Sequence, residues 1–315
     1  MDWDIYWNTL IEEKKLTTKI EELDQVDKIR GNSFTTETIC HKIYDNYFEE
    51  WKPHLEVVKQ DFLKLIDTFE GVHLQTSRIK TIDSLLVKVI SKRYKNFADE
   101  NNLYSSIDGD NYKEIVTDLL GMRLIINYRG KWNVIHEEIM RHFPYVDEQL
   151  YKKHGLVPIK MLPGNAMAEK ARVYYAEGDA IDEYKKYGLD TKRHNMGYRS
   201  IHYTISFENV YVEIQVRTIY DEAWSDCDHN YVYKQDENKS HTALEQLSQI
   251  LCQLTNISND MGENMREIFE QEKMIDMRNG KWKTTKECLD SFDHALERVK
   301  KAYKELEDFR KKLVT

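Results

Sequence analysis

Hydrophobic and polar positions alternate strictly along residues 197–218, GYRSIHYTISFENVYVEIQVRT. Successive side chains of a β-strand point to opposite faces, so this pattern predicts two paired strands. Glu208 and Asn209 separate the two runs and suit a two-residue turn, because Asn tolerates the positive φ that such turns need. The predicted hairpin has an apolar face of Ile201, Tyr203, Ile205, Val212, Ile214 and Val216. Its polar face consists of Tyr198, Ser200, His202, Thr204, Glu213, Gln215 and Arg217.

Helical spacing dominates both sides of this hairpin. Residues 44–66 form an apolar stripe that Pro53 should kink or divide. Beyond residue 234, Leu244, Leu247, Leu251 and Leu254 recur at helical intervals, and residues 291–313 form a last amphipathic pattern. We therefore expect three regions. These are a helical region at residues 1–71, a mixed domain at 72–236 and a helical region at 237–315.

The bulk composition limits what the protein can bind. The chain has 315 residues, 41% of them hydrophobic, and a formal net charge of -9. It can bury one good core or two small ones, and any site for a polyanion must be a local basic patch. The acidic N-terminus lacks the pattern of a signal peptide, and no stretch approaches the length of a membrane span. We expect a cytoplasmic protein with no membrane association.

A row of cations is predicted between residues 78 and 88. Lys80, Ser84 and Lys88 recur every four residues, so a helix would align them on one face, with Arg78 just ahead of its first turn. The opposite face of this helix would carry Ile82, Leu85, Leu86, Val89 and Ile90. Such a row suits a triphosphate. The alternative is a charged face that only meets water.

Acidic and polar side chains add two further candidate sites. Asp118 precedes the apolar run of TDLLGMRLIINY, where its carboxylate would suit Mg²⁺ and the nearby Arg123 a phosphate. The alternative is a turn aspartate followed by a core strand. The polar face of the hairpin could stack on a base, hydrogen-bond its edge and hold a metal or phosphate. Alternatively, it could simply be solvated, as one face of an antiparallel sheet often is.

The order and spacing of these blocks closely resemble the synthetase domain of the RelA/SpoT family. The matching blocks are Arg78-x-Lys80-x-x-x-Ser84-x-x-x-Lys88, Asp118-x-x-Gly121-x-Arg123, Gly197-Tyr198-Arg199-Ser200-x-His202, Glu213-x-Gln215-x-Arg217-Thr218, and Trp224 with Asp228-His229-x-x-x-Tyr233-Lys234. The helical flanks look like those of the small alarmone synthetases. The resemblance implies an α+β, nucleotidyltransferase-like mixed sheet flanked by helices, with helical N- and C-terminal extensions. It also implies a pyrophosphokinase that transfers pyrophosphate from ATP to the ribose 3′-hydroxyl of GDP or GTP.

The resemblance further implies roles for individual residues. ATP would be held by Arg78, Lys80, Ser84, Lys88 and Arg123. Asp118 and Glu213 would be the catalytic residues and would bind Mg²⁺, and Glu213 could help to deprotonate the 3′-hydroxyl. The acceptor nucleotide would lie beside Tyr198, His202, Gln215 and His194. Among these, Tyr198 would stack on the guanine.

The chain departs from the family pattern at the acceptor site. His194 stands where many members have lysine, and Asp228 stands where glutamate is more frequent. Toxin-like relatives place pyrophosphate on the 3′-terminal adenosine of tRNA, and the altered pocket keeps this second function open. The basic stretches 91–95 and 308–312 are small, so the net negative charge favours a guanosine acceptor.

A third candidate function is that of a non-catalytic nucleotide-binding or interaction protein with the same fold. Alarmone degradation is not expected, because the metal hydrolase domain of bifunctional members needs a His-Asp pair and the chain has none. We also expect a homo-oligomer that forms through the C-terminal helices.

Overall fold

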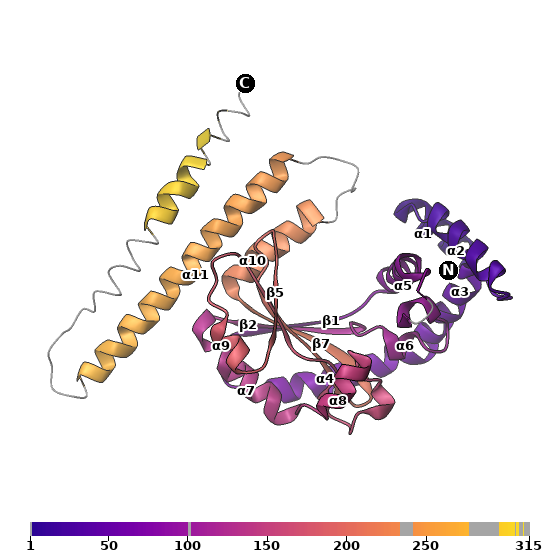
Figure 1. Ribbon diagram of the computed structural model, residues 1–315, viewed down its shortest axis with the longest axis horizontal. Helices are drawn as coiled ribbons and strands as arrows, with labels where there is room; N and C mark the ends of the chain where they lie inside the picture. The colour runs from indigo at the N-terminus through magenta and orange to yellow at the C-terminus, as the bar shows by residue number, and fades with distance from the viewer. Residues whose placement is uncertain are drawn as a thin grey trace.

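The computed structural model describes residues 2–99, 102–233, 242–276, 296–305, 307–308 and 311. A mixed sheet lies at its centre (Figure 1). The strands are β1 (Leu74–Ile79), β2 (Leu120–Ile126), β3 (Ala166–Met167), β4 (Arg172–Tyr175), β5 (Asp190–Arg193), β6 (Ser200–Phe207) and β7 (Val210–Thr218). Their order is β1-β2-β7-β6-β4-β5, with β3 paired to β6. β2 pairs with β7 and β4 with β5 in parallel, whereas the other pairs are antiparallel. The expected mixed sheet flanked by helices is confirmed.

Helices surround this sheet (Figure 1). They are α1 (Trp3–Lys14), α2 (Thr17–Ile29), α3 (Thr36–Asn46), α4 (Lys52–Ile66), α5 (Ile82–Asn96), α6 (Tyr112–Ile115), α7 (Trp132–His142), α8 (Glu148–His154), α9 (Asp182–Lys186), α10 (Ile219–Asp228) and α11 (Thr242–Asp276). In the view of Figure 1, α1, α2, α3 and α5 gather at the right, whereas α10 lies above the sheet with α11 beside it. The N-terminal and C-terminal extensions are therefore helical, as expected.

The predicted hairpin is confirmed residue by residue. Glu208 and Asn209 have φ of 50° and 60°, the left-handed pair that a two-residue turn of type I′ requires. The register pairs His202 with Gln215 and Thr204 with Glu213. The apolar face packs on α4 and α7. Phe62 of α4 lies 5.0 Å from the ring of Phe207 at the end of this face.

The polar face of the hairpin is largely withdrawn from water. Ser200, Thr204 and Arg217 are buried, and Glu213 and Gln215 are only partly exposed. A sheet face that only met solvent would leave such side chains open. The alternative of a simply solvated face is therefore contradicted, and the polar side chains must find partners within the protein.

The predicted alignment of the cationic row on one helix is wrong for Lys80, whereas Arg78 lies ahead of the helix as expected. Arg78 lies on β1, and the backbone N–H of Lys80 donates to the carbonyl of Leu119 at 2.9 Å, which continues the ladder between β1 and β2. The helix α5 begins only at Ile82, where Thr81 caps it by accepting from the backbone N–H of Ser84. The residues expected on the opposite side of the helix are buried: Ile82, Leu85, Leu86, Val89 and Ile90.

Pro53 divides the N-terminal helical segment as expected. A π-helical turn, Tyr47–Trp51, separates α3 from α4, and Pro53 stands in the first turn of α4. Proline lacks an N–H and its ring crowds the carbonyl four residues earlier, so the preceding turn widens.

The C-terminal leucines lie on α11, where Leu251 is half-buried and the other three are exposed. Leu244, Leu247 and Leu254 are each about two-fifths exposed, at 38%, 40% and 39%. The face that packs inward carries Cys252 and Ile257 instead. Residues 296–305 are helical, and the rest of the expected last helix, except residues 307, 308 and 311, lies outside the described residues. No helix in the described ranges is long and apolar enough to cross a bilayer. The expected boundaries at residues 71/72 and 236/237 stay a prediction.

Candidate active site

Asp118 connects two lysines of the cationic row. It lies two residues before β2, and its two carboxylate oxygens accept from Lys80 Nζ and Lys88 Nζ, each at 2.8 Å. Burial raises the pKa of Asp118, but the charges of Lys88 and Lys80 outweigh this effect and leave the pKa below its usual value. Asp118 is therefore an ionised carboxylate held between two cations.

Glu222 connects two arginines in the same way. It lies in the first turn of α10 and accepts from Arg123 Nη1 at 2.6 Å and from Arg217 Nη1 at 2.9 Å. Arg123 is on β2 and Arg217 on β7, and both strands end beside α10. One carboxylate thus fixes two guanidinium groups from neighbouring parallel strands.

Arg217 in turn supports Tyr198. Its guanidinium carbon lies 4.9 Å from the centre of the Tyr198 ring, and its Nη2 donates to the Tyr198 hydroxyl and to Gln215 Oε1. A guanidinium over an aromatic ring is attracted by the negative face of the ring. Burial raises the pKa of the Tyr198 hydroxyl, although the charge of Arg217 acts in the opposite direction. Tyr198 is therefore a protonated, fixed aromatic ring.

His202 extends the polar network from Tyr198 to Glu213. The Tyr198 hydroxyl and His202 Nε2 are 2.8 Å apart, and His202 Nδ1 lies 3.7 Å from Glu213 Oε1. Gln215 Nε2 donates to Glu213 Oε2 at 2.9 Å. Burial raises the pKa of Glu213, but His202 and Lys88 together leave it below its usual value, so the carboxylate is ionised. The charge of Asp118 is also close enough to affect Glu213.

A cavity of about 230 Å³ opens where β1, β2 and β7 lie side by side. Its walls include Arg78 of β1, Arg123 of β2, and Glu213 and Gln215 of β7. The cavity therefore adjoins both the cations and the carboxylate of the polar face. An anion that entered it would meet two guanidinium groups.

Comparison with protein families identifies this arrangement. The sequence model described as "Region found in RelA / SpoT proteins" matches residues 77–238, just over half of the chain. The chain belongs to the RelA/SpoT family. The expectation from the spaced blocks is thereby confirmed at the level of the family. No curated protein matches the chain significantly.

Several solved structures are similar to this chain at low identity. The small alarmone synthetase 1 from Bacillus subtilis is 16% identical with a TM-score of 0.45, covering 72% of this chain and 99% of its own. The same enzyme bound to its product pppGpp is 17% identical with a TM-score of 0.43, covering 72% of this chain and 97% of its own. A GTP pyrophosphokinase family protein from Streptococcus pneumoniae is 14% identical with a TM-score of 0.44, covering 73% of this chain and 97% of its own.

Two further residues of the candidate site, Ser84 and His194, lie at the edges of this network. The exposed Ser84 accepts from Thr81 Oγ1 at 2.9 Å, so its hydroxyl takes part in the cap of α5. The ring of His194 lies 5.4 Å from that of Tyr198, and its buried Nδ1 has no hydrogen-bond partner among the described residues. Burial lowers the pKa of His194. Lys234 lies outside the described residues.

Sequence reasoning missed Glu222. The signal that could have found it is the helix start directly after β7, where Thr218 caps α10 and acidic residues occupy its first turn. A helix that begins two residues after Arg217 turns the side chain of Glu222 back toward the end of the strand. The pairing with Arg123, 99 residues away in sequence, could not be read from local spacing.

The carboxylates of this RelA/SpoT site fit a magnesium ion. Asp118 and Glu213 both stay ionised and are both largely buried, with exposed side-chain fractions of 15% and 23%. Mg²⁺ is bound in nucleotide enzymes by one or two carboxylates, with substrate phosphates and water completing its shell. Among the described residues, no group of three or more His, Cys, Asp or Glu side chains could hold a metal alone. The site therefore offers two carboxylates and leaves further ligands to a substrate.

Proposed function

We propose that the protein is a pyrophosphokinase that transfers pyrophosphate from ATP to the ribose 3′-hydroxyl of GDP or GTP, which makes (p)ppGpp and releases AMP. The observation that carries the proposal is the continuous polar network on one face of the sheet. It runs from Arg123 through Glu222 and Arg217 to Tyr198, and through His202 to Glu213. Membership of the RelA/SpoT family supports the same reaction type.

The donor side would bind ATP through Arg78, Lys80, Lys88 and Arg123, with Ser84 at the rim. Phosphoryl-type transfer involves little covalent chemistry with the protein. It depends on placing the attacking and leaving oxygens in line and on neutralising the charge that develops. Arg78 and Arg123, which line the cavity, and Lys80 and Lys88, which bind Asp118, would supply the positive charge. Lys80 and Lys88 now bind Asp118. When ATP binds, part of their positive charge would neutralise the triphosphate instead.

The acceptor side would hold the guanine on Tyr198, with His202, Gln215 and His194 beside the nucleotide. Glu213 lies where β7 passes from the donor cavity to the acceptor side, and could accept the proton of the 3′-hydroxyl. Mg²⁺ held by Asp118 and Glu213 would neutralise phosphate charge on the transferred group. Each of these roles is part of the proposal.

One assay tests the reaction and its alternatives. The protein is supplied with γ-labelled ATP, Mg²⁺ and either GDP, GTP or deacylated tRNA, and the labelled product is identified. We expect label on a guanosine nucleotide. Label on tRNA alone would instead support the toxin-like reaction, and label on none of the three would favour a non-catalytic binding protein.

Removal of the Tyr198 ring should weaken the acceptor selectively. Base stacking on an aromatic side chain contributes about 1–3 kcal/mol, so Tyr198→Ala should raise the acceptor KM by roughly 5-fold to 150-fold. The ATP KM should stay within about twofold. Tyr198→Phe keeps the ring and loses only the hydroxyl contacts to His202 and Arg217, so it should have the smaller effect. Equal increases of both KM values in steady-state kinetics would contradict the assignment.

The exposed apolar side chains of α11 support self-association. Leu247, Leu254, Met261 and Ile268 follow one another at seven-residue intervals and are each about two-fifths exposed. Helices with such a repeat bury it against another helix. We expect light scattering at micromolar concentration to give a multimer, and Leu247→Glu combined with Leu254→Glu to give a smaller species. A monomeric mass of the unmodified protein would refute the prediction.

A further inference from the structure

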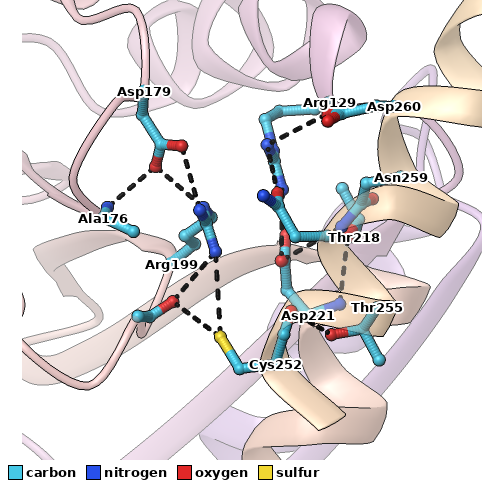
Figure 2. A network of polar contacts seen from close by, with 12 residues as sticks. Arg129, Ala176, Asp179, Arg199, Thr218, Asp221, Cys252, Thr255, Asn259 and Asp260 are labelled. Atoms are coloured by element: carbon cyan, nitrogen blue, oxygen red, sulfur yellow. Dashed lines mark hydrogen bonds and ion pairs between the residues drawn. The ribbon is translucent and has the colours of Figure 1, made fainter. Parts of the chain in front are cut away.

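Arg199, the residue after Tyr198, is tied to a separate loop. Its Nε and Nη2 donate to the two carboxylate oxygens of Asp179 at 2.7 Å and 3.0 Å (Figure 2). Asp179 is fixed in turn, because it accepts from the backbone N–H of Ala176 at 2.8 Å. The side chains of Arg199 and Asp179 are only 10% and 18% exposed. A bidentate pair of this kind restricts both direction and distance, which a single hydrogen bond does not.

The same guanidinium also holds the backbone in front of Tyr198. Arg199 Nη1 donates to the carbonyl of Gly197 at 3.1 Å, so the contact spans Tyr198 from one side to the other. The ring of Tyr198 contacts Arg217, His202 and the rings of Tyr174, His194 and Trp224, whereas no contact joins it to the Arg199 guanidinium among the described residues. Arg199 can therefore act on Tyr198 only through the backbone.

The helix α11 closes this turn from the other side. Cys252 Sγ lies 3.6 Å from the carbonyl oxygen of Gly197 and 4.0 Å from Arg199 Nη1 (Figure 2). Gly197 has a φ of +84°, and a Cβ at this position would stand 2.5 Å from Cys252 Sγ. The backbone that leads into Tyr198 is thus held against α11 at a point where only glycine fits.

We infer that Arg199 is a positioning residue for the acceptor nucleotide, which it orients by fixing the backbone of Gly197 and Tyr198 against Asp179 and α11. The inference rests on the proposed function for its use of Tyr198 as the acceptor platform. It assigns to Asp179 and to α11, which lie outside the donor cavity, a part in the affinity for the acceptor. The donor side is not involved, since the Arg199 guanidinium has no contact with Arg78, Arg123 or Asp118 among the described residues.

The test compares Arg199→Gln with a matched loss of an arginine pair elsewhere. The control is Arg141→Gln on α7, which breaks a 2.9 Å pair with the buried Glu138. This pair lies far along the chain from residues 194–199. Hydrogen exchange of residues 194–199 is measured without substrate, and KM is measured for ATP and for GDP or GTP. For Arg199→Gln we expect exchange of this loop to be about tenfold faster and the acceptor KM to be about tenfold higher, with the ATP KM within twofold.

A second variant guards against misfolding of the first. Asp179→Asn keeps an acceptor for Arg199 but removes the charge, so it should shift both readouts in the same direction and by less. The double variant should be no worse than Arg199→Gln alone, because both changes remove one interaction. Loop exchange in Arg199→Gln equal to that in Arg141→Gln would overturn the inference, as would equal increases of both KM values. If the unmodified protein labels no acceptor, the proposed function fails, and the exchange measurement still decides whether Arg199 fixes the loop.

Discussion

Replacement of Glu213 by glutamine is expected to abolish turnover while nucleotide binding persists. The amide has the size of the carboxylate and can keep a contact with Gln215, so the cavity that Arg78 and Arg123 line should stay intact. It cannot supply negative charge to a cation or accept a proton at neutral pH. Loss of one such group lowers kcat by about 10²- to 10⁴-fold. Transfer of label from γ-labelled ATP measures kcat, and equilibrium dialysis with ATP measures binding.

Glu208→Gln serves as the matched control for this change. Glu208 belongs to the same hairpin but lies exposed in its turn, away from the polar face. It should retain full activity and the same ATP affinity as the unmodified protein. A Glu213→Gln protein that turned over at the unmodified rate would show that neither the metal role nor the base role belongs to Glu213.

Replacement of Asp118 by asparagine should reduce both stability and activity. Lys80 and Lys88, with exposed side-chain fractions of 12% and 21%, would lose their shared counter-charge. Breaking a buried ion pair by removing one partner costs about 3–5 kcal/mol, because a buried charge is left uncompensated. We expect the free energy of unfolding, measured with urea, to fall by about 3 kcal/mol. Label transfer should fall to background, because the proposed metal loses a carboxylate.

Two further variants separate these effects of Asp118. Asp110→Asn breaks the exposed pair with Lys42 and should change the free energy of unfolding by less than about 1 kcal/mol. Adding Lys88→Met to Asp118→Asn removes one of the uncompensated cations, so it should recover part of the lost stability without recovering activity. An Asp118→Asn protein that unfolded at the same urea concentration as the unmodified protein would disprove the energetic role of the pair.

Periodicity predicted the hairpin because its signal is local. Strict alternation and a turn suited to positive φ define both strands, their register and the side on which Tyr198, His202 and Glu213 lie. The structure of the cationic row was harder to predict. A spacing of four residues indicated a helix through Lys80, whereas a backbone hydrogen bond to Leu119, distant in sequence, keeps Lys80 in the extension of β1. The local pattern carries no information about such a partner.

The buried face of α11 likewise could not be predicted from the local sequence pattern. Its leucine repeat predicted the helix, yet the residues that pack inward are not the leucines. Ser248 accepts from the Trp224 indole and Asn259 donates to Asp221, so hydrogen-bond partners on α10 determine the inward face. The sequence of residues 146–190 shows no clear period, because β3 and β4 have two and four residues, too short for a period to be recognised. The roles assigned to individual site residues stay predictions.

The pairing of Asp118 with Lys80 and Lys88, and of Glu222 with Arg123, bears on how an acidic protein tolerates a cationic pocket. Each of these positive groups already has a carboxylate partner before a nucleotide arrives. On the proposed function, an incoming triphosphate would substitute for these internal carboxylates instead of meeting unpaired cations. The affinity for the triphosphate would then be the difference between two sets of counter-ions.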